Sequence, residues 1–430
     1  MKSRIRSLFL IAAIFCALST NARADEVTDW TQIMLESAKA AVPPTSPLVI
    51  TRVAAIVQSS IFDAVNGIER RYTYVHVQPN APKGASKRSA AVQAAYVSLA
   101  RLYPAQIATL DMKRAASLAA ISSGSAAEHS TSIQRGIDWG QTVADEIWAW
   151  RSTDGFSDVI PPYTGGTAVG QWRPTPPGNL AGAGVAFADM TPWVMSSPAQ
   201  FRPAGPPALS SARYTTDFEE TRTMGSASSL IRTADQTLAS RFWAASTSTY
   251  SFNHVALSLS MEQHLSLSEN SRLLALMNIA IADAGIGCFD AKYVFSFWRP
   301  VTAIPLAATD GNAATAADPA WLPLLTTPNH PEYPSGHSCL SGAAGRVLAN
   351  YFGDQSSISV DSDVMLGVVR TFTSFTDALD EVKNARINAG IHFRSATDDG
   401  QTLGIGVADN TMKNFLRPLH GNHGEDDDRD

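Results

Sequence analysis

Apolar side chains recur at helical spacing along most of this chain. Residues 54–68 (AAIVQSSIFDAVNGI), 89–102 and 136–150 place them three or four positions apart, so that they line one face of an α-helix. No stretch shows the sustained alternation of apolar and polar residues that indicates a half-buried strand. We therefore expect an all-α fold built as a helical bundle.

Further helices are predicted at residues 235–243, 253–267, 268–297, 335–352, 362–388 and 400–416. Residues 154–214 differ, because they are crowded with Gly and Pro and cannot form one regular element. This segment also carries Trp172, Phe187, Trp193 and Phe201. It is therefore either an ordered excursion that packs on the helices and walls a pocket, or an inter-domain linker.

These patterns divide the chain into five parts. Residues 1–24 have a basic start, a short apolar stretch and an Ala-Arg-Ala site, which together predict a secretory signal peptide. The other parts are an N-terminal helical region (25–153), the Pro/Gly-rich excursion (154–232), a catalytic region (233–418) and an acidic disordered tail (419–430).

Length and charge narrow the classes of function. A chain of 430 residues that is 45% hydrophobic can bury a large core. Its net charge of −6 gives no reason to expect a nucleic-acid partner. Beyond the signal peptide no uninterrupted apolar run reaches about 18 residues, so we expect no membrane span in the mature chain. The predicted location is the periplasm or the outside of the cell. The sequence does not fix the oligomeric state, and a homo-oligomer is possible.

Two cysteines remain once the signal peptide is removed. Cys288 and Cys339 would lie in a compartment that permits disulfides. The sequence leaves two alternatives open, a bridge between them or two buried free thiols.

Three short blocks in the C-terminal half carry the chemistry. In the first, Lys292 precedes Arg299 by seven residues, close to two helical turns, so both cations can point the same way along one helix. The aromatic residues between them, among them Trp298, are unusual for a solvated face. Taken alone, the spacing also fits ordinary surface cations.

The second block is Pro-Ser-Gly-His, residues 334–337. Pro334 stops a helix from extending backward, Ser335 is a good N-cap, and Gly336 allows a ligand to approach the backbone closely. The first N–H groups of such a helix form an anion site. His337 would stand in the first turn, where it can exchange a proton with a bound anion. The plainer alternative is a capped helix with an incidental histidine.

In the third block Arg386 precedes His392 by six residues, about 120° apart on an ideal helix. A break at Gly390 could bring both side chains to one ligand; otherwise His392 would be an ordinary core histidine. Taken together, the blocks supply cations, a helix N-terminus and two histidines, which suit a tetrahedral oxyanion.

The order and spacing Lys-x6-Arg-Pro, Pro-Ser-Gly-His and Arg-x5-His resemble the signature shared by vanadium-dependent haloperoxidases and type 2 phosphatidic acid phosphatases. The resemblance implies an all-α bundle with the site at its core, and vanadate as cofactor. It implies that the oxyanion is held by Lys292, Arg299, Arg386 and the backbone of Ser335 and Gly336. His392 would coordinate vanadium or attack phosphorus, and His337 would be the acid–base.

The third block departs from the family pattern. It begins with Ala385 in place of the usual Ser, and Ala396 stands where an Asp usually follows the second His. Asp398 and Asp399 lie just beyond and could substitute. Without such a carboxylate, the residues that bind the anion are held less firmly, and we expect a lower anion affinity.

Two enzymatic functions fit the resemblance. A haloperoxidase would use vanadate and hydrogen peroxide to oxidise a halide, and bromide is the halide we expect. A secreted acid phosphatase would hydrolyse phosphate esters through a phosphohistidine intermediate. The missing membrane spans favour the haloperoxidase, as does the aromatic Phe-Ser-Phe-Trp-Arg-Pro block. His330 precedes Ser-Gly-His as in algal bromoperoxidases, so His330 and Trp298 become candidates for tuning the halide, unless His330 merely bonds the loop backbone. A catalytically weak oxyanion-binding protein is the third alternative.

Overall fold

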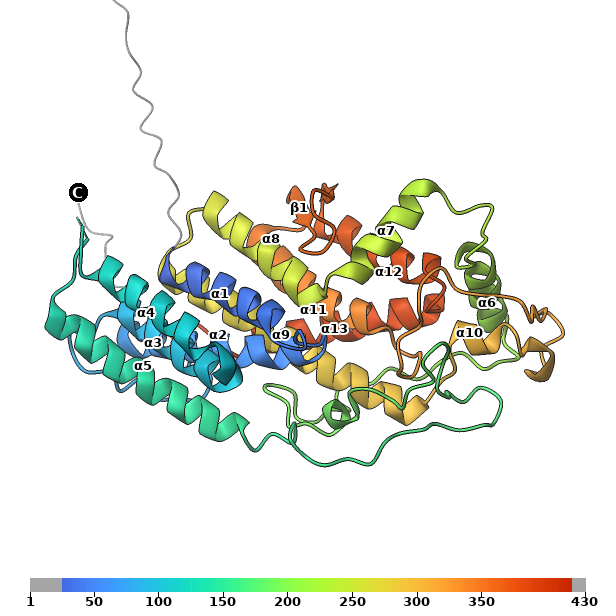
Figure 1. Ribbon diagram of the computed structural model, residues 1–430, viewed down its shortest axis with the longest axis horizontal. Coiled ribbons are helices and arrows are strands. Elements are labelled where there is room, and N and C mark those ends of the chain that lie inside the picture. Colours follow the sequence, from blue (N-terminus) through green and yellow to red (C-terminus); the bar gives the residue numbers. More distant parts are fainter. Residues whose placement is uncertain (1–24, 125, 420–430) are drawn as a thin grey trace, which may run out of the picture.

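The computed structural model describes residues 25–124 and 126–419, and nearly all of the regular structure in them is helical (Figure 1). The predicted signal peptide and residues 420–430 of the predicted tail lie outside this part of the chain. The α-helices are α1 (Glu26–Ala40), α2 (Val49–Glu69), α3 (Lys87–Leu102), α4 (Ile107–Ile121), α5 (Ser130–Arg151), α6 (Ala212–Met224), α7 (Ala234–Ala245), α8 (Ser248–Glu262), α9 (Leu267–Phe295), α10 (Pro300–Ala303), α11 (Gly336–Phe352), α12 (Phe375–Asn388) and α13 (Arg394–Asn414). Short 3-10 turns, η1 (Pro104–Gln106), η2 (Val185–Ala188) and η3 (Ala307–Thr309), join some of them. The all-α prediction is confirmed.

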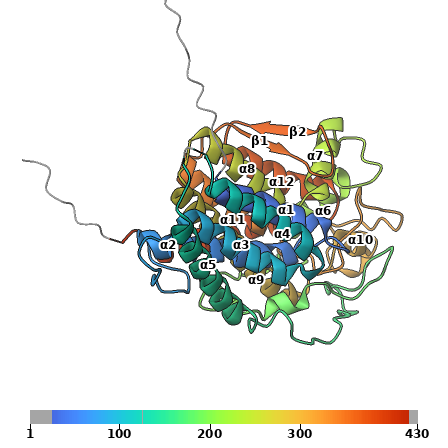
Figure 2. The same ribbon diagram turned by 60° about the vertical axis from the view of Figure 1, so that its left-hand side comes forward.

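One correction concerns residues 358–372. The helix predicted from residue 362 begins only at Phe375, where Ser374 caps it by accepting the N–H of Asp377. The preceding residues form an antiparallel hairpin of β1 (Ile358–Asp361) and β2 (Val369–Phe372), which lies against α8 and α12 (Figure 2). No strand was expected, because four-residue strands are too short to show alternation.

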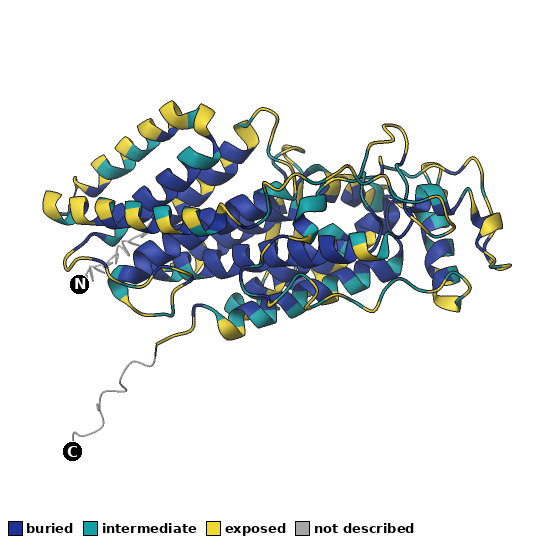
Figure 3. Ribbon diagram, turned by 90° about the horizontal axis from the view of Figure 1, so that it is seen from below, coloured by how far each residue is buried: buried dark blue, intermediate teal, exposed yellow. Residues whose placement is uncertain are grey.

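The central element is α9, which packs against α2, α11 and α13. Among the described residues it alone is long and apolar enough to cross a membrane, with a mean hydropathy of 1.6, yet its apolar window is wholly buried inside the protein. Outer helices instead carry buried and exposed stripes (Figure 3). The apolar run of α9 therefore reflects its place in the core.

The Pro/Gly-rich excursion is fastened to this central helix. Asp283, buried in α9, accepts hydrogen bonds from the N–H groups of Trp193, Val194 and Met195 at 2.7, 2.8 and 2.9 Å. Three consecutive amides on one carboxylate hold the segment in a fixed path over α9. The excursion is thus an ordered layer of the molecule, whereas the predicted domain boundaries around it remain predictions.

Candidate functional site

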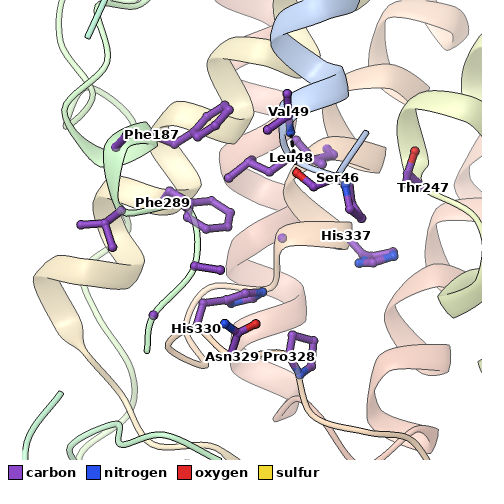
Figure 4. Close-up of a pocket in the computed structure, with 18 of the residues that line it drawn as sticks. Ser46, Leu48, Val49, Phe187, Thr247, Phe289, Pro328, Asn329, His330 and His337 are labelled. Atoms are coloured by element: carbon purple, nitrogen blue, oxygen red, sulfur yellow. Dashed lines mark hydrogen bonds between the residues drawn. The ribbon is translucent and has the colours of Figure 1, made fainter. Parts of the chain in front are cut away.

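The second and third sequence blocks line one cavity of about 620 Å³. The polar side of its lining includes His330, Gly336, His337, Arg386 and His392, which come from the loop before α11, the start of α11, the last turn of α12 and the loop that follows. His330 and His337 are labelled in Figure 4. Lys292 and Arg299 are fully buried and do not line this cavity. Residues of the second and third blocks therefore border the cavity, whereas the two cations of the first block lie behind its wall.

Lys292 and Arg299 do not converge by helical phase, which corrects the sequence interpretation. Helix α9 ends at Phe295, because Ser296 adopts a left-handed conformation with φ of 44°. Arg299 then has an extended backbone and stands before α10. The two side chains approach each other because the chain turns at Ser296.

The ammonium group of Lys292 is held by main-chain carbonyls. It donates to the oxygens of Pro331 (2.8 Å), Glu332 (3.1 Å) and Pro334. Burial lowers the pKa of Lys292 to about 8. With its donors occupied, Lys292 fixes the loop that leads into α11 and contributes a positive charge from behind that loop.

Arg299 is likewise engaged. Its Nε donates to the carbonyl of His330 (2.9 Å), its Nη1 to that of Ile391 (2.7 Å), and its Nη2 lies 3.0 Å from His330 Nδ1. Nη1 also lies 3.1 Å from His392 Nε2. Burial lowers the pKa of Arg299 to about 10. This guanidinium therefore ties the His330 loop to the His392 loop.

His392 is oriented by a carboxylate that sequence reasoning missed. Its Nδ1 lies 2.9 Å from Glu332 Oε1, which also accepts the N–H of Phe393 at 2.9 Å. A hydrogen on Nδ1 leaves the lone pair of the neutral imidazole on Nε2, the nitrogen that faces Arg299. Burial lowers the pKa of His392 well below its usual value and raises that of Glu332 to about 7. The imidazole is thus neutral, and its Nε2 electron pair accepts an N–H of Arg299.

Neither predicted substitute for the missing Asp reaches this histidine. Asp399 accepts a hydrogen bond from the Tyr333 hydroxyl at 2.6 Å, and Asp398 lies 3.3 Å from Lys383. Ala396 instead offers its carbonyl to the N–H of Ser335 at 2.9 Å. The support expected after the second histidine comes from Glu332, sixty residues upstream.

The start of α11 has the predicted cap. The Ser335 hydroxyl accepts the N–H of Ser338. The Ser335 amide donates to Ala396, so it is not free to bind an anion, contrary to the role carried over from the family. Gly336 does line the cavity, and a Cβ built on it would meet nothing within 4 Å. The open space in front of this helix therefore lies over Gly336.

His337 stands in the first turn with one ring nitrogen unengaged. The backbone of Trp243 hydrogen-bonds its ring, whereas Nε2 is buried and has no partner among the described residues. Burial, reinforced by Arg386, holds the pKa of His337 well below its usual value. A neutral imidazole of this kind can take up a proton from a group in the cavity.

Arg386 differs from the other two cations. It is 3% exposed, and its Nε and Nη1 are buried without any hydrogen-bond partner in the described part of the chain. Burial lowers its pKa to about 9. The expected break is present, since α12 ends at Asn388 and Gly390 has a φ of 75°. This turn brings Arg386 and His392 to the same cavity.

Helix α6 supports the loop that carries His392. Thr221 donates from its hydroxyl to the carbonyl of His392 (3.1 Å), and Asp217 accepts the N–H of Ser395 (3.0 Å). Glu220 forms an ion pair with Arg394. The excursion segment that contains α6 therefore positions a residue of the site as well.

Two further predictions need correction. Trp298 is fully buried in a second core cluster with Tyr214 and does not line the cavity. Cys288 and Cys339 are neighbouring, buried, free thiols, so the disulfide alternative is wrong in this structure.

The buried charged groups of the site carry a net positive charge. Three cations, those of Lys292, Arg299 and Arg386, are almost fully buried, and the carboxylate of Glu332 is buried with them. Uncompensated charge is expensive inside a protein. An oxyanion in the cavity would neutralise it and satisfy the free N–H groups of Arg386.

Comparisons with known proteins agree with this geometry. Residues 272–421 match the family described as VCPO second helical-bundle domain. Vanadium chloroperoxidase of Curvularia inaequalis is 33% identical over 113 residues, a stretch that spans 23% of this chain and only 18% of that protein.

Solved structures extend the likeness over nearly the whole chain. The first bacterial vanadium-dependent iodoperoxidase superposes with a TM-score of 0.78 and 25% identity, covering 92% of this chain and 98% of the other. An apo-type bacterial vanadium-dependent chloroperoxidase, 17% identical, shares the fold with a TM-score of 0.66 over 85% of this chain and 92% of that one. The chain is thus similar to vanadium-dependent haloperoxidases in its fold, and residues 272–421 match the second helical-bundle domain described for that family.

Proposed function

We propose that this protein is a vanadate-dependent haloperoxidase, which oxidises bromide, and iodide more easily still, with hydrogen peroxide. The observation that carries the proposal is the pairing on one cavity of Arg386, buried with two unsatisfied N–H groups, and the neutral His392. The Nε2 electron pair of His392 would exchange its hydrogen bond from Arg299 for the centre of an oxyanion. Arg386 offers charge and hydrogen bonds to an oxyanion, and His392 offers a nitrogen ligand to the central atom of that oxyanion.

Vanadate fits the residues present. Arg386 would donate to its oxygens, Gly336 leaves room at the helix mouth, and His392 Nε2 would be the nitrogen ligand. Lys292 and Arg299 would add positive charge from behind the loops they hold. When bound, vanadate supplies the Lewis acid that activates hydrogen peroxide for attack by the halide.

The protein's own groups would manage protons and orientation. Glu332 holds the His392 ring by accepting from Nδ1, which keeps Nε2 unprotonated. His337 Nε2 would accept a proton from hydrogen peroxide as it enters and would return it within the cavity. His330, whose ring lies 5.3 Å from that of Phe289, borders the same space and would influence which halide is accepted.

A paired assay tests the proposal. Protein loaded with orthovanadate is given bromide or iodide with peroxide, and vanadate-free protein is given a phosphate ester. We expect vanadate-dependent halide oxidation that His392→Ala abolishes. Ester hydrolysis that vanadate inhibits would replace this function by that of a secreted acid phosphatase. Absence of both activities would leave only oxyanion binding.

The role of His337 can be tested separately. The variant His337→Ala should retain bound vanadate, because the anion's ligand and Arg386 remain, but lose about 10²- to 10⁴-fold in turnover. Equilibrium dialysis measures the first property and steady-state kinetics the second. Loss of vanadate with unchanged turnover per bound vanadate would assign His337 to anion binding.

We also propose that the protein is exported after removal of residues 1–24. Cell fractionation followed by N-terminal sequencing of the mature chain tests this. A protein that stays in the cytoplasm with Met1 in place would contradict it.

A further inference from the structure

The ring of His337 is held by the end of helix α7. Trp243 lies in the last turn of this helix, where the final four carbonyls have no partner within the helix itself. The His337 ring donates a hydrogen bond to this backbone, and Nε2 is buried without a partner in the described part of the chain. The donor is therefore Nδ1. Figure 4 shows the ring on the same side of the cavity as Thr247, which follows α7.

This hydrogen bond decides which nitrogen of the neutral His337 ring can take up a proton. A hydrogen on Nδ1 leaves the electron pair on Nε2. A general base works well when a third group orients it in this way. The carbonyl end of α7 carries a partial negative charge, so it would also stabilise the ring after Nε2 has gained a proton.

The side chain of Trp243 anchors this end of α7. Its ring is 2% exposed, and its Nε1 donates to Glu381 Oε1 of α12 at 2.9 Å. The same ring stacks on Phe252 of α8 and lies tilted against Phe372 of β2, with centroids 6.4 Å apart in both pairs. Contacts with three other elements therefore set the position of the carbonyl that His337 uses.

Glu381 is fixed in turn by Arg370 of β2. The Nε of Arg370 donates to Glu381 Oε1 at 2.8 Å, and its Nη2 pairs with the other oxygen of that carboxylate. Its Nη1 lies 2.7 Å from Asp235 in the first turn of α7. Hydrogen bonds to Asp235 and Glu381 raise the pKa of Arg370, so the guanidinium stays charged. The hairpin thereby holds both ends of α7 near α12 (Figure 2).

We propose, on the basis of the haloperoxidase function inferred above, that Trp243 and Glu381 are positioning residues for His337. Their hydrogen bond fixes the end of α7 so that its carbonyl keeps the ring in the tautomer with Nε2 free. Neither side chain lines the cavity, so both act on the reaction only through the orientation of His337.

Nitrogen NMR on vanadate-free protein with labelled histidines measures which ring nitrogen carries the hydrogen. The signals of His337 are those missing from His337→Gln. The native ring should carry its hydrogen on Nδ1 and none on Nε2. Trp243→Phe, which keeps an aromatic ring and the carbonyl but removes the indole N–H, should give signals intermediate between the two tautomers. A native ring with its hydrogen on Nε2 would overturn the proposal.

Trp139→Phe is the matched control. Trp139 is also buried, and its Nε1 donates to the carbonyl of Ala64 at 2.9 Å, but it does not line the cavity. In vanadate-loaded protein Trp243→Phe should lower the turnover of halide oxidation about 3- to 30-fold, because the base is misplaced. Its affinity for orthovanadate, and the turnover of Trp139→Phe, should stay within about twofold of the native values. Equal changes in tautomer and turnover for both variants would show a general effect of lost packing and overturn the proposal.

Variants of Glu381 test the other half of the hydrogen bond. Glu381→Leu should lower turnover as Trp243→Phe does, and combining the two should cost less than about twofold more, because each breaks the same bond. Glu381→Gln keeps an oxygen that accepts the indole N–H and should retain more turnover than Glu381→Leu. Independent, multiplying losses would overturn the shared role. Native protein without halide oxidation would refute the proposed function, whereas the NMR measurement on vanadate-free protein tests the positioning of His337 by itself.

Discussion

Replacing Arg386 by methionine should stabilise the oxyanion-free protein and weaken its oxyanion site. The side chain is 3% exposed, and two of its nitrogens have no partner among the described residues. Methionine has nearly the same length and carries neither charge nor donors. The substitution therefore removes a charge that the empty site leaves uncompensated, at little cost in packing.

The structure sets the magnitude. A pKa lowered from 12.5 to about 9 corresponds to a penalty on the order of 5 kcal/mol for the charged group inside the folded protein. Replacing buried charge by a well-packed apolar residue typically recovers about 1–4 kcal/mol. For a chain of this size the midpoint of thermal unfolding should rise by roughly 2–5 °C in buffer without oxyanions.

Oxyanion binding should change in the opposite direction. Each hydrogen bond from a charged donor contributes about 1.5–3 kcal/mol, so losing two should weaken orthovanadate binding by at least roughly 100-fold. The assay is the unfolding midpoint of native protein and Arg386→Met, measured with and without orthovanadate. The variant should start higher and gain little from the anion.

Arg52, a buried arginine that forms an ion pair with Asp154, supplies the matched control. Arg52 is also buried, but its Nε lies 2.8 Å from Asp154 and its Nη2 donates to the carbonyl of Arg151. Arg52→Met should destabilise the protein by about 3 kcal/mol and leave the gain from orthovanadate unchanged. The reasoning is refuted if Arg386→Met unfolds at a lower temperature than the native protein without oxyanion, or if orthovanadate stabilises both equally.

Three further outcomes are expected. Sulfate, which keeps its charge across the range, should give its full rise in the unfolding midpoint below pH 7 and a progressively smaller rise between pH 8 and 10. The pKa values of Lys292 and Arg386, about 8 and about 9, lie below their usual values, so the cationic forms that bind the anion are lost as the pH rises. An effect that stays constant to pH 10 would contradict this. Glu332→Gln should weaken orthovanadate binding in equilibrium dialysis by about 10- to 100-fold, because the ligand imidazole loses the carboxylate that orients it, and unchanged affinity would assign that task elsewhere. Thiol titration of the denatured, unreduced mature chain should find Cys288 and Cys339 both reactive, and finding neither would restore the disulfide.

The second and third sequence blocks could be recognised because their signals are local. Ser335 caps its helix through its own side chain, and Gly390 ends the preceding segment through its own backbone conformation. These features depend on a few neighbouring residues, so the sequence alone predicts them. The helical bundle follows for the same reason, from apolar spacing within single helices.

What the sequence could not provide depends on contacts between distant segments. Glu332 meets His392 from a loop whose carbonyls accept hydrogen bonds from Lys292 and Arg299. The carboxylate two residues after His330 in His-Pro-Glu-Tyr was a visible signal, but its partner was not. Ser296 ends α9 early through a left-handed conformation that serine seldom adopts. The sequence therefore carried no signal for this turn, and the estimate of helical phase was wrong.

The hydrogen-bond pattern assigns different tasks to cations that the sequence treated as equivalent. Lys292 and Arg299 donate to carbonyls of the surrounding loops and thereby fix the positions of His330 and His392. Arg386 makes no such bond in the described structure and keeps its donors for a ligand. Loss of Lys292 or Arg299 should therefore disturb the shape of the site, whereas loss of Arg386 should remove binding from a site that keeps its shape. This difference is why Arg386→Met, rather than a change at either of the other two cations, separates oxyanion binding from folding.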